Sequence, residues 1–109
     1  MKKIVMLVAV FGFAAALSAS AAEAKDNWTT LCAKCHGTEG KGDTKIGQKL
    51  GVKDFTDAKV QAAIKDEDAT KAIKEGRKNA DGNTLMKPFD TLTDDEVKAL
   101  VAYVRGLKA

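Results

Sequence analysis

The two cysteines and the single histidine of this 109-residue chain all lie within the segment Cys32-Ala33-Lys34-Cys35-His36. A disulfide between cysteines this close closes a very small loop, adds little stability and leaves His36 unexplained. A structural zinc ion takes four protein ligands, and the chain has no second cysteine–histidine pair. A thioredoxin-type dithiol follows a strand in a βαβ unit, and no strand pattern precedes this segment. These three kinds of site therefore explain the cluster poorly.

The spacing Cys-x-x-Cys-His is the attachment signature of c-type haem. Thiols at i and i+3 on one helical turn can reach the two vinyl groups along one edge of a porphyrin and form thioethers. We therefore expect Cys32 and Cys35 to bind one haem covalently and His36 to coordinate its iron through Nε2. The Nδ1–H of His36 would then be free to donate to a backbone carbonyl, which would fix the ring.

The first 22 residues have the layout of a cleaved secretory signal peptide. A basic start precedes a wholly apolar or glycine run over 4–17, and small residues follow. The run is shorter than the ~20 residues that span a bilayer, so we expect no permanent membrane anchor. The mature domain would be residues 23–109, exported to the periplasm, and c-type haem is joined to its protein outside the cytoplasm. Cleavage is compatible with three sites, after Ala21, Ala22 or Ala24.

Charge excludes one large class of partner. Lys2 and Lys3 account for two of the 18 basic residues, so residues 23–109 carry 16 basic and 15 acidic side chains. No basic block is interleaved with aromatic residues, which makes nucleic acid a poor partner. The mature chain is small and has few aromatic side chains, so a bound cofactor is a reasonable centre for its core.

A second iron ligand follows by elimination. The chain has no second histidine, and its methionines are Met1, Met6 and Met86. The first two leave with the signal peptide, so Met86 is the remaining thioether. We expect it to ligate the iron opposite His36, because methionine and histidine are a known pair of axial haem ligands. A lysine, a water molecule or an open position are the alternatives.

The first helix is expected to begin at a cap on Asp26 or Asn27 and to run toward Cys35. On an α-helix, positions i, i+3 and i+4 share one face. That rule places three side chains together, those of Trp28, Leu31 and Cys32.

Three further helices are expected, and no strand pattern of useful length appears. One begins at 56–59 and reaches Ile64, one begins at the acidic 66–68 and ends at Gly76, and the last follows the capping box at 93–96. Apolar residues at helical spacing in these segments are Val60, Ala63 and Ile64; Ala69, Ala72 and Ile73; and Val97, Leu100, Val101, Val104 and Leu107. Two long loops without periodicity, 37–51 and 76–92, are expected to wrap the haem or to form a lid.

The chain resembles the small monohaem class I cytochromes c. The likeness is carried by residues 32–37, the glycine-rich 37–51, Met86-Lys87-Pro88-Phe89 and the segment from Leu92 through Val104. The resemblance implies an all-α fold of about four helices around one haem, with the first and last helices crossing. It also implies that Trp28 packs on the last helix beside Ala24 and Tyr103.

One feature departs from this family. Its members often have a proline after the glycine-rich loop, whose carbonyl accepts the Nδ1–H of the axial histidine, but no proline of the mature domain precedes Pro88. Ile46-Gly47-Gln48 occupies the region instead, so the carbonyl that supports His36 stays open. The aromatic donors to the haem propionates are also hard to place, since Phe55 cannot donate.

Two filled axial positions leave no site for a substrate on the iron. We therefore expect a non-enzymatic, monomeric electron carrier that shuttles single electrons between redox enzymes. The alternative is a haem-containing electron-entry subunit of a dehydrogenase, reductase or peroxidase. Redox partners would dock at the exposed haem edge, and acidic ones could be steered by nearby lysines. These are Lys34, Lys41, Lys45, Lys49 and Lys87.

Overall fold

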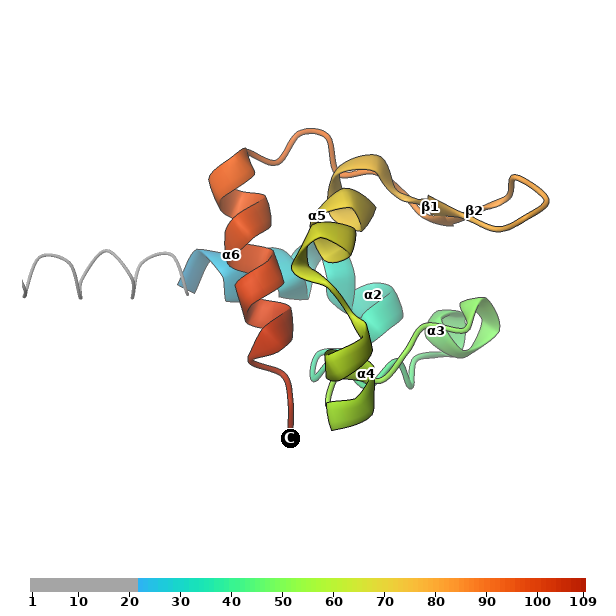
Figure 1. The fold of residues 1–109 in the computed structure, drawn as a ribbon, viewed down its shortest axis with the longest axis horizontal. Coiled ribbons are helices and arrows are strands. Elements are labelled where there is room, and N and C mark those ends of the chain that lie inside the picture. The colour runs from blue at the N-terminus through green and yellow to red at the C-terminus, as the bar shows by residue number, and fades with distance from the viewer. Residues whose placement is uncertain (1–21) are drawn as a thin grey trace, which may run out of the picture.

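The fold is known from a computed structural model that describes residues 22–109. The expected signal peptide, residues 1–22, lies outside the described residues except for Ala22. The elements follow in chain order as η1 (Trp28–Cys32), α2 (Ala33–His36), α3 (Lys45–Leu50), α4 (Ala58–Ala63), α5 (Asp66–Glu75), β1 (Arg77–Lys78), β2 (Thr84–Met86) and α6 (Asp94–Arg105) (Figure 1). Helices dominate this part of the chain, and they confirm the all-α expectation with the exception of one short hairpin.

The first helix begins before the expected cap. Residues 22–27 are already helical, and Asn27 has helical dihedral angles without a capping hydrogen bond from its side chain. The predicted start at Asp26 or Asn27 is therefore wrong. A cap requires extended backbone, which this position does not have.

A single π-helical turn, η1, continues this helix. The N–H of Ala33 donates to the carbonyl of Trp28, five residues earlier. Such a turn holds more residues than an α-turn, so the residue three positions after Trp28 leaves its face. Trp28 and Cys32 are buried as predicted, but Leu31 is 36% exposed, so its predicted place on that face is wrong.

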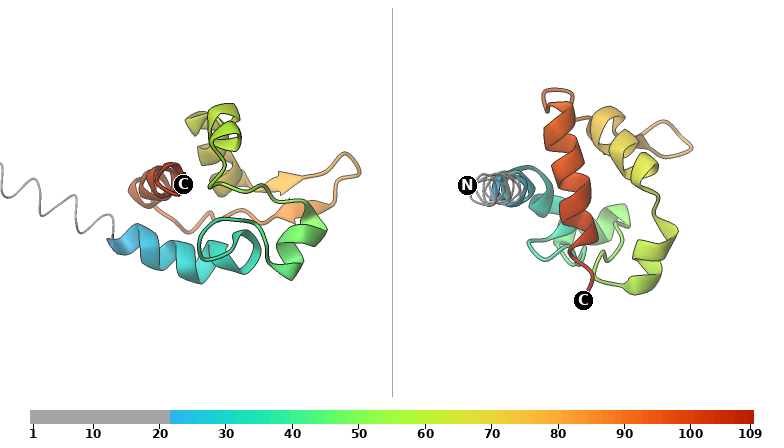
Figure 2. Two further views of the ribbon diagram at one scale, coloured as in Figure 1. Left: turned by 90° about the horizontal axis from the view of Figure 1, so that it is seen from below. Right: turned by 60° about the vertical axis from the view of Figure 1, so that its left-hand side comes forward.

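Helix α6 begins at the predicted capping box. Thr93 Oγ1 accepts from the N–H of Glu96, and the Glu96 carboxylate accepts from the N–H of Thr93. The helix crosses the N-terminal helix, which passes beside it in both views of Figure 2. The rings of Trp28 and Tyr103 lie 5.5 Å apart between centroids, so the predicted packing of Trp28 on this helix is confirmed.

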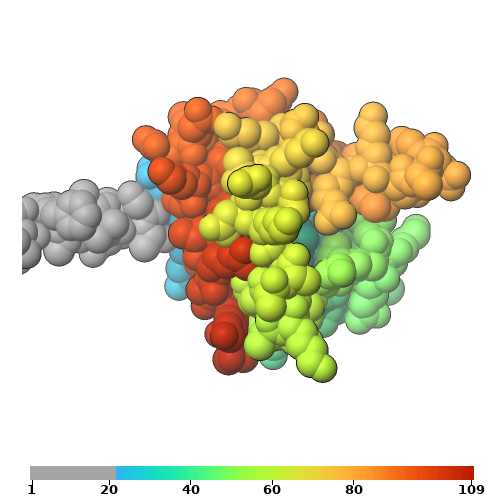
Figure 3. Space-filling model, viewed as in Figure 1, coloured from blue at the N-terminus to red at the C-terminus, as the bar shows by residue number. Residues whose placement is uncertain are grey.

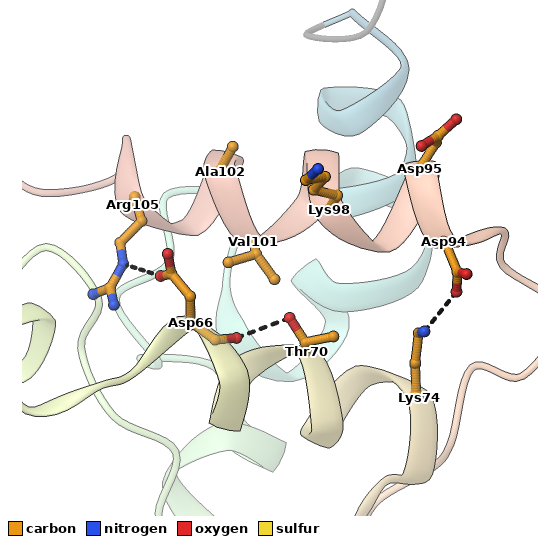
Figure 4. A pocket seen from close by; sticks show the side chains of 9 residues that line it. All are labelled: Asp66, Thr70, Lys74, Asp94, Asp95, Lys98, Val101, Ala102 and Arg105. Atoms are coloured by element: carbon orange, nitrogen blue, oxygen red, sulfur yellow. Dashed lines mark hydrogen bonds and ion pairs between the residues drawn. The ribbon is translucent and has the colours of Figure 1, made fainter.

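Helix α5 lies along α6 and runs from its acidic start to Gly76, as predicted. Ile73 is its buried residue. Two ion pairs cross between the helices near their exposed edges, from Lys74 to Asp94 and from Arg105 to Asp66 (Figure 4). The apolar contact and the charges together fix α5 against α6.

Helix α4 begins at the predicted place, with Asp57 as its N-cap. Of the predicted apolar side, Val60 and Ile64 are half-buried but Ala63 is exposed, and the buried residue of this helix is Gln61. The buried polar side chain is held by hydrogen bonds, which outweigh the usual preference for an apolar residue.

Both segments expected to be irregular contain regular structure. Helix α3 lies within 37–51, and β1 and β2 form an antiparallel hairpin within 76–92. Helix α3 and the hairpin lie on the side of the molecule away from α6 (Figures 1 and 3). The elements missed here are short, and a few residues are too few to show a helical or strand periodicity in the sequence.

The core is one cluster of buried side chains shared by the N-terminal helix, α5 and α6. Its members are Trp28, Cys32, Ile73, Val97, Leu100 and Val101. The first cysteine of the motif therefore belongs to the core itself. Within residues 22–109, no helix has the length and apolar character needed to cross a bilayer.

Candidate haem attachment site

The turn η1 and the short helix α2 carry all three residues of the motif. Cys32 is buried, Cys35 is half-buried, and neither forms a disulfide. Burial, and secondly the charge of a deprotonated Cys35, raises the pKa of Cys32 to about 11. A redox-active or metal-binding cysteine has a lowered pKa, because the thiolate is the reactive form. The Cys32 environment therefore opposes a redox-active dithiol.

The His36 imidazole lies among aromatic rings. Its centroid is 5.2 Å from that of Phe55 at an interplanar angle of 24°, and 5.6 Å from that of Trp28. Burial lowers the pKa of His36, so the ring is neutral at pH 7 and keeps a lone pair for a metal.

The expected support of His36 by a backbone carbonyl is not met. Its Nδ1 is buried and has no hydrogen-bond partner among the described residues. The family's proline after the glycine-rich loop is missing here, and residues 46–48 supply no carbonyl that accepts from the His36 Nδ1–H in its place.

Helix α3 packs directly on the motif. Thr44, the N-cap of α3, donates from Oγ1 to the carbonyl of Cys35 at 2.6 Å and accepts from the N–H of Gly47. A Cβ at Gly47 would collide with the Cys35 carbonyl oxygen. Sequence reasoning did not mention Thr44, although threonine is a common N-cap residue, and it named Gly47 without this contact.

The next two carbonyls of the motif are also bound. The carbonyl of His36 accepts from the N–H of Gly42 at 2.7 Å. The carbonyl of Gly37 accepts from Nε1 of Trp28 at 3.1 Å, which ties the end of the motif back to its beginning. The glycine-rich loop and the tryptophan therefore hold the backbone of the motif in one conformation.

Both backbone polar groups of Phe55 form hydrogen bonds. Its N–H donates to the carbonyl of Gly40 at 2.8 Å, and its own carbonyl accepts from Nε2 of Gln61 at 2.6 Å. Sequence reasoning assigned no role to Gln61 and treated Phe55 only as a side chain unable to donate. No sequence pattern marks their contact, because it depends on how 37–55 folds back on the motif.

Met86 lies at the end of β2, opposite Arg77 of β1. Its side chain is half-buried and packs against the core cluster that contains Cys32. Gly76 lies against the Met86 carbonyl, so closely that a Cβ there would collide with it. The base of the hairpin thus positions Met86 at the same core as the motif.

The donor set fits haem better than a bare metal ion. Within residues 22–109, no group of three or more His, Cys, Asp and Glu side chains could hold an ion alone. A porphyrin brings four nitrogen ligands of its own, so it needs only one or two from the protein. Two unpaired thiols, a neutral imidazole and a thioether are the kinds of anchor and ligand that such a group takes.

Comparisons with known proteins identify the family of the chain. The family model described as cytochrome c matches residues 21–108. The solved structure of the KustC0563 c-type cytochrome is 37% identical, with a TM-score of 0.65 over 78% of this chain and 96% of that one. A point mutant of the same cytochrome gives 37% identity and a TM-score of 0.64 over 79% and 99%. A search of the curated proteins finds no match. The chain therefore belongs to the cytochrome c family, as a small class I member that binds covalent c-type haem.

Proposed function

We propose that this cytochrome is a periplasmic carrier of single electrons. Cys32 and Cys35 would hold the haem through thioethers, and His36 and Met86 would be its axial ligands. When bound, the haem supplies a reversible one-electron couple at its iron. The observation that carries the proposal is the single turn that presents two unpaired thiols and a neutral imidazole against the core.

Met86 is supported as the second ligand by its chemistry and its position. It is the sole methionine of residues 23–109 and packs against the core cluster that includes Cys32. A neutral thioether in an apolar surrounding stabilises the ferrous state, which lacks the extra positive charge of ferric iron. We therefore propose a comparatively high reduction potential.

Two protein ligands leave no coordination position for a substrate. We therefore propose outer-sphere electron transfer without a catalytic activity. The protein's part is then to keep the two ligands and their surroundings in one arrangement through the redox cycle.

Replacement of Met86 tests the ligand assignment. Met86→Ala should lower the reduction potential and allow cyanide or imidazole to bind the iron readily, because the thioether is lost. The weak red-edge absorption band of oxidised iron bound to a thioether should disappear. Leu85→Ala, at a half-buried neighbour in the same strand, is the control and should change none of these. An unchanged band and potential in Met86→Ala would exclude Met86 as ligand.

Export is proposed from residues 1–22, whose basic, apolar and small-residue parts form a signal peptide. The mature protein would then work in the periplasm as a monomer. N-terminal sequencing of the purified protein tests this, since an intact Met1 would contradict it.

Electrostatic docking is proposed from five exposed lysines near the motifs. Lys41 forms an ion pair with Glu39 at 3.0 Å, which partly neutralises its charge. Most of the attraction for an acidic partner would therefore come from the other four lysines, Lys34, Lys45, Lys49 and Lys87. The rate of electron transfer to an acidic partner should fall as salt rises. Lys45→Glu should slow it further, whereas Lys98→Glu, on α6, should not. Equal effects of the two reversals would contradict a localised docking surface.

A further inference from the structure

Gln61 is the buried polar side chain of the described residues, with 7% of its surface exposed. Burying an amide is unfavourable unless its hydrogen-bonding groups are satisfied. Nε2 of Gln61 donates to the carbonyls of Phe55 at 2.6 Å and Val104 at 2.8 Å, and Oε1 accepts from Arg105 at 3.2 Å. The amide therefore joins the segment that carries Phe55 to helix α6.

This connection restrains Phe55 at the position where its ring meets His36. The Phe55 backbone is bonded on one side to Gly40 and on the other to Gln61. Its ring stacks on the imidazole at 24°, while Trp28 meets the same imidazole at 36°. Aromatic rings thus lie on the imidazole, and no group of residues 22–109 forms a hydrogen bond with its Nδ1.

The imidazole needs such a restraint. Rotation of a histidine ring about its Cβ–Cγ bond is broad and roughly two-fold, so the rotamer alone does not fix its plane. A hydrogen bond at Nδ1 ordinarily fixes that plane in metal-binding histidines. Where that bond is missing, packing against flat neighbours is what limits the rotation.

We infer that Phe55, held in place by Gln61, is a positioning residue that sets the orientation of the His36 imidazole. The inference rests on the proposed function, in which His36 is an axial ligand. It assigns to aromatic stacking, anchored by a buried amide, the task that a carbonyl acceptor would otherwise perform.

The test uses the oxidised holoprotein and four variants. Proton NMR of the haem methyl groups reports the plane of the axial imidazole, because their paramagnetic shifts depend on it. Phe55→Leu removes the flat ring, and Gln61→Met removes the amide at similar volume. Phe55→Tyr keeps the flat ring. Thr93→Ala weakens the distant cap of α6 and is the control for lost stability, measured as the midpoint of urea unfolding.

We expect Phe55→Leu and Gln61→Met to redistribute the methyl shifts or to double the set of signals. Phe55→Tyr should retain the wild-type pattern, and Thr93→Ala should lower the urea midpoint without changing that pattern. Unchanged shifts in both Phe55→Leu and Gln61→Met would overturn the inference, as would an equal change in Thr93→Ala. If Phe55→Leu fails to fold, Gln61→Met alone decides. Failure of the proposed ligation would show separately, as a wild-type spectrum without an iron-bound imidazole.

Discussion

Replacing Gly47 by alanine tests the contact between α3 and the attachment motif. Alanine in place of glycine ordinarily stabilises a helix interior by about 1 kcal/mol. Here the added Cβ would overlap the Cys35 carbonyl oxygen and lie 2.8 Å from Thr44 Oγ1 and 2.9 Å from Val52 Cγ2. Overpacking of this kind costs about 1–3 kcal/mol. Loss of the Thr44–Cys35 hydrogen bond adds about 1 kcal/mol. The net result is a free energy of unfolding lower by about 2 kcal/mol.

Urea unfolding of the holoprotein, followed by far-ultraviolet circular dichroism, measures this change. Gly106→Ala is the matched control, since Gly106 also has right-handed dihedral angles and a Cβ there comes no closer than 3.4 Å to other atoms. It should be neutral or stabilising by up to about 1 kcal/mol. Of the two alanines, only the one at position 47 should therefore be destabilising. A Gly47→Ala protein as stable as the wild type would show that α3 does not press on the motif.

Two further outcomes are expected. Arg105→Met should reduce the free energy of unfolding by about 2 kcal/mol, because the guanidinium donates to the carbonyls of Gln61 and Ile64 at the end of α4. Thermal or urea unfolding measures this change. The control is Lys74→Met, which removes the more exposed ion pair with Asp94 and should cost less than about 1 kcal/mol. The hydrogen bonds from Thr93 hold the pKa of Glu96 below its ordinary value of 4.5, so the stability that Glu96 adds is present above that pH and is lost as the pH falls through the lowered pKa. Unfolding curves of Glu96→Gln at successive pH values should lack that part of the acid loss, and identical pH profiles would contradict it.

The local parts of this fold could be predicted because their causes lie close together in the sequence. The capping box and the apolar spacing after Thr93 led to the correct start of α6, although the helix ends at Arg105, before Leu107. The acidic start and Gly76 bounded α5 in the same way. The motif itself needs only five consecutive residues. The spacing of Trp28 and Cys32 predicted that they share one helix face, and both are buried in the structure.

Several of the errors come from tertiary hydrogen bonding that overrides local preference. Helix α3 has only six residues, and its N-cap oxygen is held by the Cys35 carbonyl as well as by Gly47. Gln61 is buried because three groups distant in the sequence satisfy its amide. The π turn moves Leu31 off the buried face, and no pattern of side chains in the sequence predicts such a turn. Phe55 likewise became part of the site through the fold and not through a motif.

The loop after the motif is best understood as the C-terminal cap of the attachment helix. A helix of four residues ends with carbonyls that lack intrahelical partners. The three carbonyls of residues 35–37 are bound instead by a hydroxyl of Thr44, the N–H of Gly42 and the indole of Trp28. Each donor comes from a different kind of group, so no repeating pattern could supply them. The loop is therefore aperiodic because it must bring two of these donors, the Gly42 N–H and the Thr44 hydroxyl, to fixed points on the motif, and its glycines allow the backbone to approach closely enough to do so.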